Sequence, residues 1–254
     1  MELEVFGHMQ LTSVLWVLAG VVVLVNVGLG FLVMCPRCKV ISSNLVRLPE
    51  NAVKRGEIVL TFDDGPDAYV TPLILDQLDK YCAKASFFCI GKKAVAHPDL
   101  LAEIVRRGHS IENHSYNHRN LFAFCGMRKL TIEVLATQQV LNLANNSVNP
   151  RFFRAPFGFR SPWLGFVLRQ LHMQHVAWTR RGYDTVCHNS DLVFRRLVHN
   201  LSAGDILLMH DGGSASTVTG QPVVLEVLPR LLECFEQHDL HSVSLPMALD
   251  NSGF

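Results

Sequence analysis

Two adjacent aspartates and a spaced pair of histidines are the residues of this sequence best suited to chemistry. Asp63 and Asp64 end an apolar run in T-F-D-D-G-P. Neighbouring carboxylates repel each other, so one of the two is usually bound to a metal ion or a cation, although Asp-Gly is also common in solvated turns. His114 and His118 in N-H-S-Y-N-H are four positions apart, which places both imidazoles on one side of a helical turn. Among twelve histidines such a pair can also arise by chance, so its position after an apolar run matters.

One carboxylate and two imidazoles would leave a metal ion with an open position for water. This pattern is typical of catalytic rather than structural zinc sites, and it favours hydrolysis. The other aspartate is available as the base, and His210 in L-L-M-H is placed to protonate a leaving amine. Arg154 could hold the base carboxylate by a charge-assisted bond, and Asp184 could orient His210 or keep it charged.

The elements that must position these residues alternate in type along the chain. Short apolar runs predict strands, and the stretches between most of them have helical spacing. This alternation predicts an α/β fold with a parallel sheet, in which the loops at the carboxyl ends of the strands carry the chemistry. The candidate residues all fall at or just beyond such ends. The predicted strands are 57–62, 85–90, 110–112, 151–154, 175–178, 206–209 and 241–243, and the predicted helices are 71–81, 98–107, 130–143, 161–171, 192–201 and 223–236.

Length and composition limit the chain to one sizeable core. It has 254 residues, of which 49% are hydrophobic and 18% charged, and its formal net charge is +1. This balance gives no electrostatic case for nucleic acid as a partner. We divide the chain into an N-terminal flank (1–10), a membrane anchor (11–34), a connector (35–55) and a catalytic domain (56–250).

The segment 11–34 has the sequence pattern of a single transmembrane helix. It is uncharged over about 24 positions, which is long enough to cross the hydrocarbon core of a bilayer. The flank before it carries Glu2 and Glu4, whereas Arg37, Lys39 and Arg47 follow it. These flanking charges favour a single-pass membrane protein with its catalytic domain on the cytoplasmic side, although few charges decide the orientation.

At this point the motifs resemble those of a known family. From about residue 57 to 249 the chain resembles the polysaccharide deacetylases with a NodB-homology domain, also called carbohydrate esterase family 4. The resemblance lies in five segments that follow the family's order and cover nearly all of the catalytic domain. They are TFDDGPD (61–67), KASFFCIG (84–91), GHSIENHSYNH (108–118), RAPFG (154–158) and ILLMH (206–210).

The resemblance implies a distorted (β/α) barrel of about seven strands that binds a divalent metal, zinc or alternatively cobalt. It assigns the role of base to Asp63. It assigns the metal to a set of three ligands, which are Asp64, His114 and His118.

The resemblance also assigns the groups around the metal. Arg154 would tether the base, and His210 would be the general acid. Leu208 would lie beside the acyl methyl group, and a backbone N–H near Phe157 would hold the oxyanion together with the metal. The implied reaction removes an N-acyl group, which the resemblance indicates is N-acetyl, from an amino sugar.

Two motifs depart from the family pattern. Phe157 stands where tyrosine is usual, which removes a hydroxyl contact but keeps the backbone donor. The fourth motif, usually D-x-x-D-W, reads R-G-Y-D-T here, so that Arg181 replaces the first aspartate while Asp184 is kept. This change puts the usual polymer specificity in doubt.

The altered motif leaves two substrate classes open. Arg180 and Arg181 could lie in a solvated loop, or they could bind an anionic group near the sugar. The second possibility predicts a lipid-phosphate-linked amino sugar as the substrate, and its rival is a glycan polymer. A different class of function is a catalytically silent sugar-binding module on the same fold, but the retained Asp63 and His210 argue against it.

Overall fold

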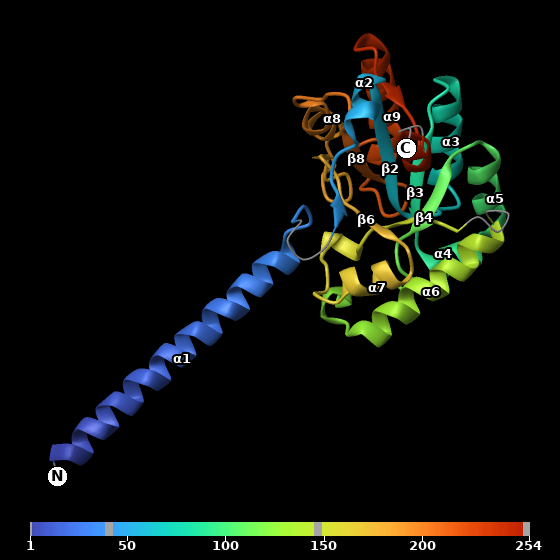
Figure 1. Ribbon diagram of the computed structural model, residues 1–254. Coiled ribbons are helices and arrows are strands. Elements are labelled where there is room, and N and C mark those ends of the chain that lie inside the picture. The colour runs from blue at the N-terminus through green and yellow to red at the C-terminus, as the bar shows by residue number, and fades with distance from the viewer. Residues whose placement is uncertain (1, 39–42, 145–148, 251–254) are drawn as a thin grey trace.

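The computed structural model describes residues 2–38, 43–144 and 149–250, and within the first helix the side chains of residues 13–28 and 30. A compact α/β body follows one long helix, which extends away from it (Figure 1). Ten α-helices lie in the described part of the chain. They are α1 (Glu2–Met34), α2 (Glu50–Lys54), α3 (Val70–Lys80), α4 (Gly91–Ala96), α5 (Pro98–Arg106), α6 (Met127–Ala144), α7 (Leu164–Gln170), α8 (Ser190–Val198), α9 (Val223–Gln237) and α10 (Leu245–Asp250).

The strands form one parallel sheet with the order β1-β6-β5-β4-β3-β2-β8-β7, and β9 pairs with the start of β2. The chain between β6 and β7 connects the two edges, since Ala177 N donates to Leu45 O and Thr179 N to Ile206 O. The sheet therefore curls into a partly closed barrel. Its strands are β1 (Asn44–Leu45), β2 (Glu57–Gly65), β3 (Ala85–Cys89), β4 (Ser110–Asn113), β5 (Phe152–Phe153), β6 (Gln174–Val176), β7 (Arg180–Arg181), β8 (Ile206–His210) and β9 (His241–Ser242).

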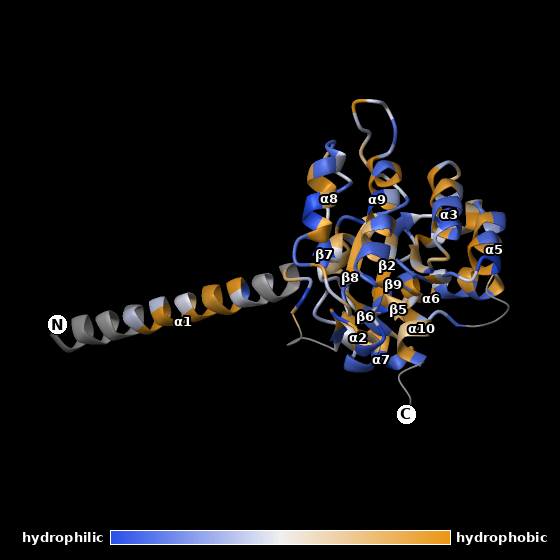
Figure 2. Cartoon of the chain, turned by 90° about the horizontal axis from the view of Figure 1, so that it is seen from above, coloured by the Kyte–Doolittle hydropathy of each residue, from blue (hydrophilic) through white to orange (hydrophobic). Residues whose placement is uncertain are grey.

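Both faces of the curled sheet are covered, as a parallel sheet requires. Apolar strands occupy the centre of the body and helices with polar outer faces surround them (Figure 2). On the outer face, one cluster packs β2, β3 and β8 against α3, α5, α8 and α9. The barrel interior holds a second apolar cluster, to which several strands each contribute one side chain: Val59, Phe88, Phe152, Val176 and Ile206.

The seven strands and six helices expected from the sequence are all present, with ends shifted by a few residues. The barrel has more strands than the predicted seven, because β1 and β7 also pair with it. Each is only two residues long, so neither presents the alternating pattern that identifies a strand. One interpretation of the sequence placed Arg180 and Arg181 in a solvated loop. In the structure they form the edge strand β7, which pairs with β8.

The N-terminal helix α1 is continuous over 33 residues, and its described side chains lie exposed. In the described part of the chain, no helix combines the length and hydropathy that a membrane crossing needs. The membrane anchor predicted over 11–34 is therefore unsupported. Some of its side chains lie outside the described residues.

Candidate active site

The candidate residues meet at one end of the barrel because of the two-residue period of its strands. In β2, Thr61 and Asp63 follow the interior residue Val59 at steps of two, so all three side chains face the interior. The same step leads from Ile206 to His210 in β8. Asp63 and His210 are register partners in neighbouring strands, which places the predicted base and the predicted acid side by side.

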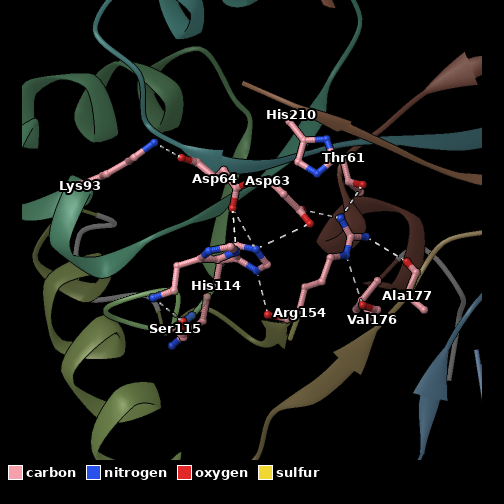
Figure 3. A network of polar contacts seen from close by, with 12 residues as sticks. Thr61, Asp63, Asp64, Lys93, His114, Ser115, Arg154, Val176, Ala177 and His210 are labelled. Carbon is pink, nitrogen blue, oxygen red and sulfur yellow. Dashed lines mark hydrogen bonds and ion pairs between the residues drawn. The ribbon is translucent and has the colours of Figure 1, made fainter. Parts of the chain in front are cut away.

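Asp64, His114 and His118 come together as the sequence predicted. One ligand atom from each lies within 4.8 Å of the others. Asp64 Oδ1 is 3.3 Å from His114 Nε2 and 3.0 Å from His118 Nε2 (Figure 3). This oxygen is buried and has no hydrogen-bond partner among the described residues. Ligand atoms bound tetrahedrally at about 2.1 Å from zinc lie about 3.4 Å apart, so the three atoms fit a shared divalent ion.

The local backbone differs from the helical turn expected around the two histidines. Residues 114–118 form a loop in which Ser115 and His118 have positive φ angles of 63° and 49°. This conformation is uncommon for residues other than glycine and costs free energy, as is frequent at functional sites. Asp64 also has a positive φ of 71°, at an irregularity in the pairing of β2 with β3. A bulge of this kind re-aims a side chain and explains how two adjacent aspartates can serve different purposes.

The tautomer of His114 suits a metal ligand. Its Nδ1 lies 2.8 Å from the carbonyl oxygen of Arg154, which can only accept, so Nδ1–H donates and Nε2, which faces Asp64, is the nitrogen left to bind a metal ion. Burial alone raises the pKa of the Asp64 carboxyl, but the two imidazoles outweigh burial and hold this pKa below its usual range. Asp64 is therefore ionised, as a metal ligand must be.

Asp63 is held by a buried guanidinium. Arg154 is fully buried, and its Nη1 donates to Asp63 Oδ1 at 2.7 Å and to Thr61 Oγ1 at 2.8 Å. The other guanidinium nitrogens donate to the carbonyl oxygens of Val176 and Ala177 (Figure 3). Every arm of Arg154 is therefore used, which fixes the position of the Asp63 carboxylate.

His210 is oriented by Asp184. His210 Nδ1 is 2.8 Å from one oxygen of Asp184, and the backbone N–H of His210 donates to the other. Burial lowers the pKa of the His210 imidazole, but the charge and hydrogen bond of Asp184 outweigh burial and raise the pKa to about 9. His210 therefore carries a proton at neutral pH, with Nε2 left for a substrate.

A cavity of about 380 Å³ opens onto these groups. Phe157 and Leu208, which the family resemblance assigns to the surroundings of the acyl group, both line it. Phe157 has a positive φ of 58° and its ring lies 4.7 Å from that of His118. Trp178, Thr185, Val186 and Gly213 also line the cavity and were not anticipated.

The two arginines of the altered motif lie in different environments. Arg181 lines the cavity. Arg180 instead pairs with the buried carboxylate of Asp205 at 3.0 Å and donates to the backbone of Asn200. Arg180 is therefore held within the fold by a carboxylate that it shares with Arg47, and only Arg181 of the two is among the residues that line the cavity. Successive residues of a strand point to opposite faces, and this separates them.

Several supporting residues were missed by the sequence analysis. Glu133 of α6 accepts hydrogen bonds from the backbone N–H groups of Tyr116 and Asn117, inside the histidine loop. Lys93 of α4 donates to the carbonyl oxygen of Asp64 at 2.6 Å. Glu133 lies far from every motif, and Lys93, although it follows the segment 84–91 by two residues, belongs to no motif itself, so no local pattern identified either contact.

The polysaccharide deacetylase family matches residues 50–176. A chitooligosaccharide deacetylase from Sinorhizobium fredii is 31% identical over 165 residues, which are 65% of this chain and 76% of the relative. The solved structure of a peptidoglycan N-acetylglucosamine deacetylase is 26% identical, with a TM-score of 0.74 over 82% of this chain and 94% of that one.

A CE4 family pseudoenzyme from Bacillus anthracis has the same fold, with a TM-score of 0.72 and 22% identity. The similarity covers 82% of this chain and 69% of the pseudoenzyme. At this identity it shows the fold alone. Activity must therefore be argued from the residues of this chain.

Proposed function

The chain belongs to the polysaccharide deacetylase family, hydrolases of carbon–nitrogen bonds other than peptide bonds, and we propose that it removes the N-acetyl group of an amino sugar by metal-dependent hydrolysis. The convergence of Asp64, His114 and His118 carries the proposal. Asp63 and His210 flank this group at the carboxyl ends of neighbouring strands and could transfer protons.

Each protein group has a task in this reaction. A divalent ion, zinc or cobalt, held by the three ligands would lower the pKa of a water molecule and polarise the amide carbonyl. Asp63 takes the proton from the attacking water, and Arg154 holds its carboxylate in position by a hydrogen bond. His210 protonates the departing amine, with Asp184 holding the ring. The products are acetate and the free amino sugar.

The walls of the cavity position the acyl group. Leu208 and Phe157 present apolar surface for the acetyl methyl group. The backbone N–H near Phe157 is our candidate donor to the developing oxyanion, and it needs no tyrosine hydroxyl.

The substrate class follows from the relatives. They are named for chitooligosaccharide and for peptidoglycan N-acetylglucosamine, so a glycan containing N-acetylglucosamine is the substrate we propose. The lipid-phosphate-linked sugar lacks such support and is the second candidate. The cytoplasmic face inferred from the flanking charges stays a prediction, which a topology reporter fused at the C-terminus would test.

Acetate release separates the deacetylase from a silent sugar-binding module. The chain is stripped of metal with a chelator, mixed with an N-acetylglucosamine oligosaccharide, and then resupplied with zinc or cobalt. We expect acetate only after metal is returned. A binding module would bind the oligosaccharide and release no acetate in either state.

A further inference from the structure

Arg181 is a cation in the cavity of the candidate active site, and no carboxylate in the described part of the chain forms an ion pair with it. The neighbouring cations are paired, since Arg154 binds Asp63 and Arg180 binds Asp205. Arg181 forms no ion pair with any described residue, and its Nε is buried without a hydrogen-bond partner. Buried polar atoms without partners are rare in folded proteins, and each calls for an explanation.

Aromatic rings hold the Arg181 guanidinium in place. Its central carbon lies 5.4 Å from the ring of Trp178 and 4.8 Å from the ring of Tyr183. A second guanidinium, of Arg196 in α8, lies 5.5 Å from the same Tyr183 ring and likewise has no acidic partner among the described residues. The guanidiniums of Arg181 and Arg196 thus both lie near the Tyr183 ring.

The backbone beneath this arrangement is constrained. Tyr183 has a positive φ of 63°, which is uncommon for an aromatic residue. Before it, Gly182 packs so closely on α8 that a Cβ atom there would lie 2.6 Å from Val193. The junction of β7 and α8 therefore holds Tyr183 near both guanidiniums at a cost in strain, which is frequent at ligand sites.

We propose that Arg181, with Arg196 beside it, binds an oxyanion of the substrate, so that the preferred substrate is an N-acetyl amino sugar carrying a carboxylate or phosphate near the scissile amide. A guanidinium is planar and binds these groups through two parallel hydrogen bonds. The proposal rests on the deacetylase function and adds a charge requirement to it. Arg180, which the sequence could not distinguish from Arg181, is left out of the site because it pairs with Asp205 and does not line the cavity.

Three N-acetylglucosamine oligosaccharides test the oxyanion site. One is neutral, one alternates with N-acetylmuramic acid and carries its carboxylates, and one carries a phosphate ester. In Arg181→Gln, we expect the ratio of kcat/KM for an anionic to that for the neutral oligosaccharide to fall about tenfold, the usual scale for a charge-assisted hydrogen bond. The loss should lie mainly in KM, and the wild-type preference should weaken as salt is added.

Arg195→Gln is the matched control. Arg195 neighbours Arg196 on α8, is exposed, and contacts no aromatic ring in the described structure, so its loss should leave the ratio unchanged. If Arg181→Gln lowers the kcat/KM ratio for the carboxylate or for the phosphate oligosaccharide, the result supports the oxyanion site and identifies the anion that it binds. A ratio within about twofold of wild type on both arms would overturn the proposal.

Calorimetric affinities for the same oligosaccharides separate this proposal from the proposed function. If wild type releases no acetate but binds an anionic oligosaccharide more tightly, and Arg181→Gln loses that preference, the deacetylase function fails and the oxyanion site stands. If wild type is active without any charge preference in rate or affinity, the function stands and the oxyanion site is wrong.

Discussion

The buried side chain of Arg154 connects the candidate base to the strands around it. It donates to Asp63 and Thr61 in β2 and to the carbonyl oxygens of Val176 and Ala177 at the end of β6. Its central carbon also lies 4.1 Å from the ring of Phe88. Because this one side chain bonds to β2 and to the end of β6 and also contacts Phe88 in β3, the carboxylate of Asp63 has little freedom to turn away from the metal ligands.

Asp63→Asn tests the role of the base. Asparagine keeps the shape of the side chain but cannot take up a proton, so turnover should fall by roughly 10² or more. Bound metal should stay at the wild-type level, because Asp63 Oδ2 lies 3.9 Å from His114 and is not among the three ligands. Acetate release and metal content are measured on the same sample. A variant with full rate would show that the base is another group.

Asp184→Asn tests the acid through the pH profile. Asp184 raises the pKa of His210 to about 9 against the effect of burial, and a general acid works only while it is protonated. Wild-type kcat/KM should therefore decline as pH rises toward 9. In the variant the pKa of His210 falls, so this alkaline limb should move at least about one pH unit lower. An alkaline limb at the wild-type position in Asp184→Asn would remove His210 from the role of acid.

At the scale of elements, helix α6 holds the loop that carries both histidines. Glu133 in α6 is buried, and one of its oxygens accepts from the backbone of Tyr116 and of Asn117 while the other accepts from the Asn117 side chain. These bonds oppose the strain of the positive φ angles at Ser115 and His118. The helix thus positions metal ligands that it does not itself contain.

Glu133→Gln should weaken metal binding without touching the ligands. Replacing one carboxylate oxygen by an NH₂ group turns an acceptor into a donor that faces other donors, so the loop loses its anchor. We expect metal affinity to fall about tenfold or more, as for other outer-sphere partners of metal ligands. Glu103→Gln is the control, because Glu103 pairs with Arg106 and Arg107 on the surface of α5. Equal affinity in both variants would contradict this role.

Strands and amphipathic helices could be predicted from the sequence, whereas the loop that carries the two histidines could not. Long apolar strands and amphipathic helices were predicted because burial imposes their period, and the step of two from Val59 to Thr61 and Asp63 directs the site inward. The helical turn at His114 was wrong because positive φ at Ser115 and His118 has no sequence signal outside glycine and asparagine. Contacts between distant elements, such as Glu133 to the loop, depend on packing that spacing cannot reveal.

At the scale of the whole molecule, one buried carboxylate connects both edges of the curled sheet. Asp205 precedes β8 and is fully buried, and its two oxygens bind Arg47, which follows β1, and Arg180 in β7 at 2.6 and 3.0 Å. The edge strands are only two residues long and have few ladder bonds of their own. Asp205 therefore contributes to closing the barrel around the site.

Asp205→Asn should destabilise the whole fold. Removing one partner of a buried ion pair costs about 3–5 kcal/mol. Arg47 is partly exposed and can turn to water, so we expect about 2–3 kcal/mol from denaturant unfolding, below that range. Glu50→Gln, which breaks the exposed pair with Lys54, should change stability by less than about 0.5 kcal/mol. Equal unfolding midpoints for the two variants would show that the edges are held elsewhere.

The different environments of Arg180 and Arg181 also depend on the fold of the whole molecule. The two residues are adjacent and identical in type, so sequence alone assigned them together. Only the closed sheet directs Arg180 to Asp205 and leaves Arg181 in the cavity. Family motifs predicted the reaction, whereas the partners that decide charge in the cavity come from chain segments far apart in sequence.

Calorimetric titration of the metal-stripped chain with zinc tests the central claim most directly, because metal uptake is read without a substrate. We expect one equivalent to bind wild type, with Asp64→Ala and His118→Ala showing no comparable uptake while remaining folded by circular dichroism. Uptake in either variant equal to that of wild type, or none by the folded wild-type chain, would contradict the account.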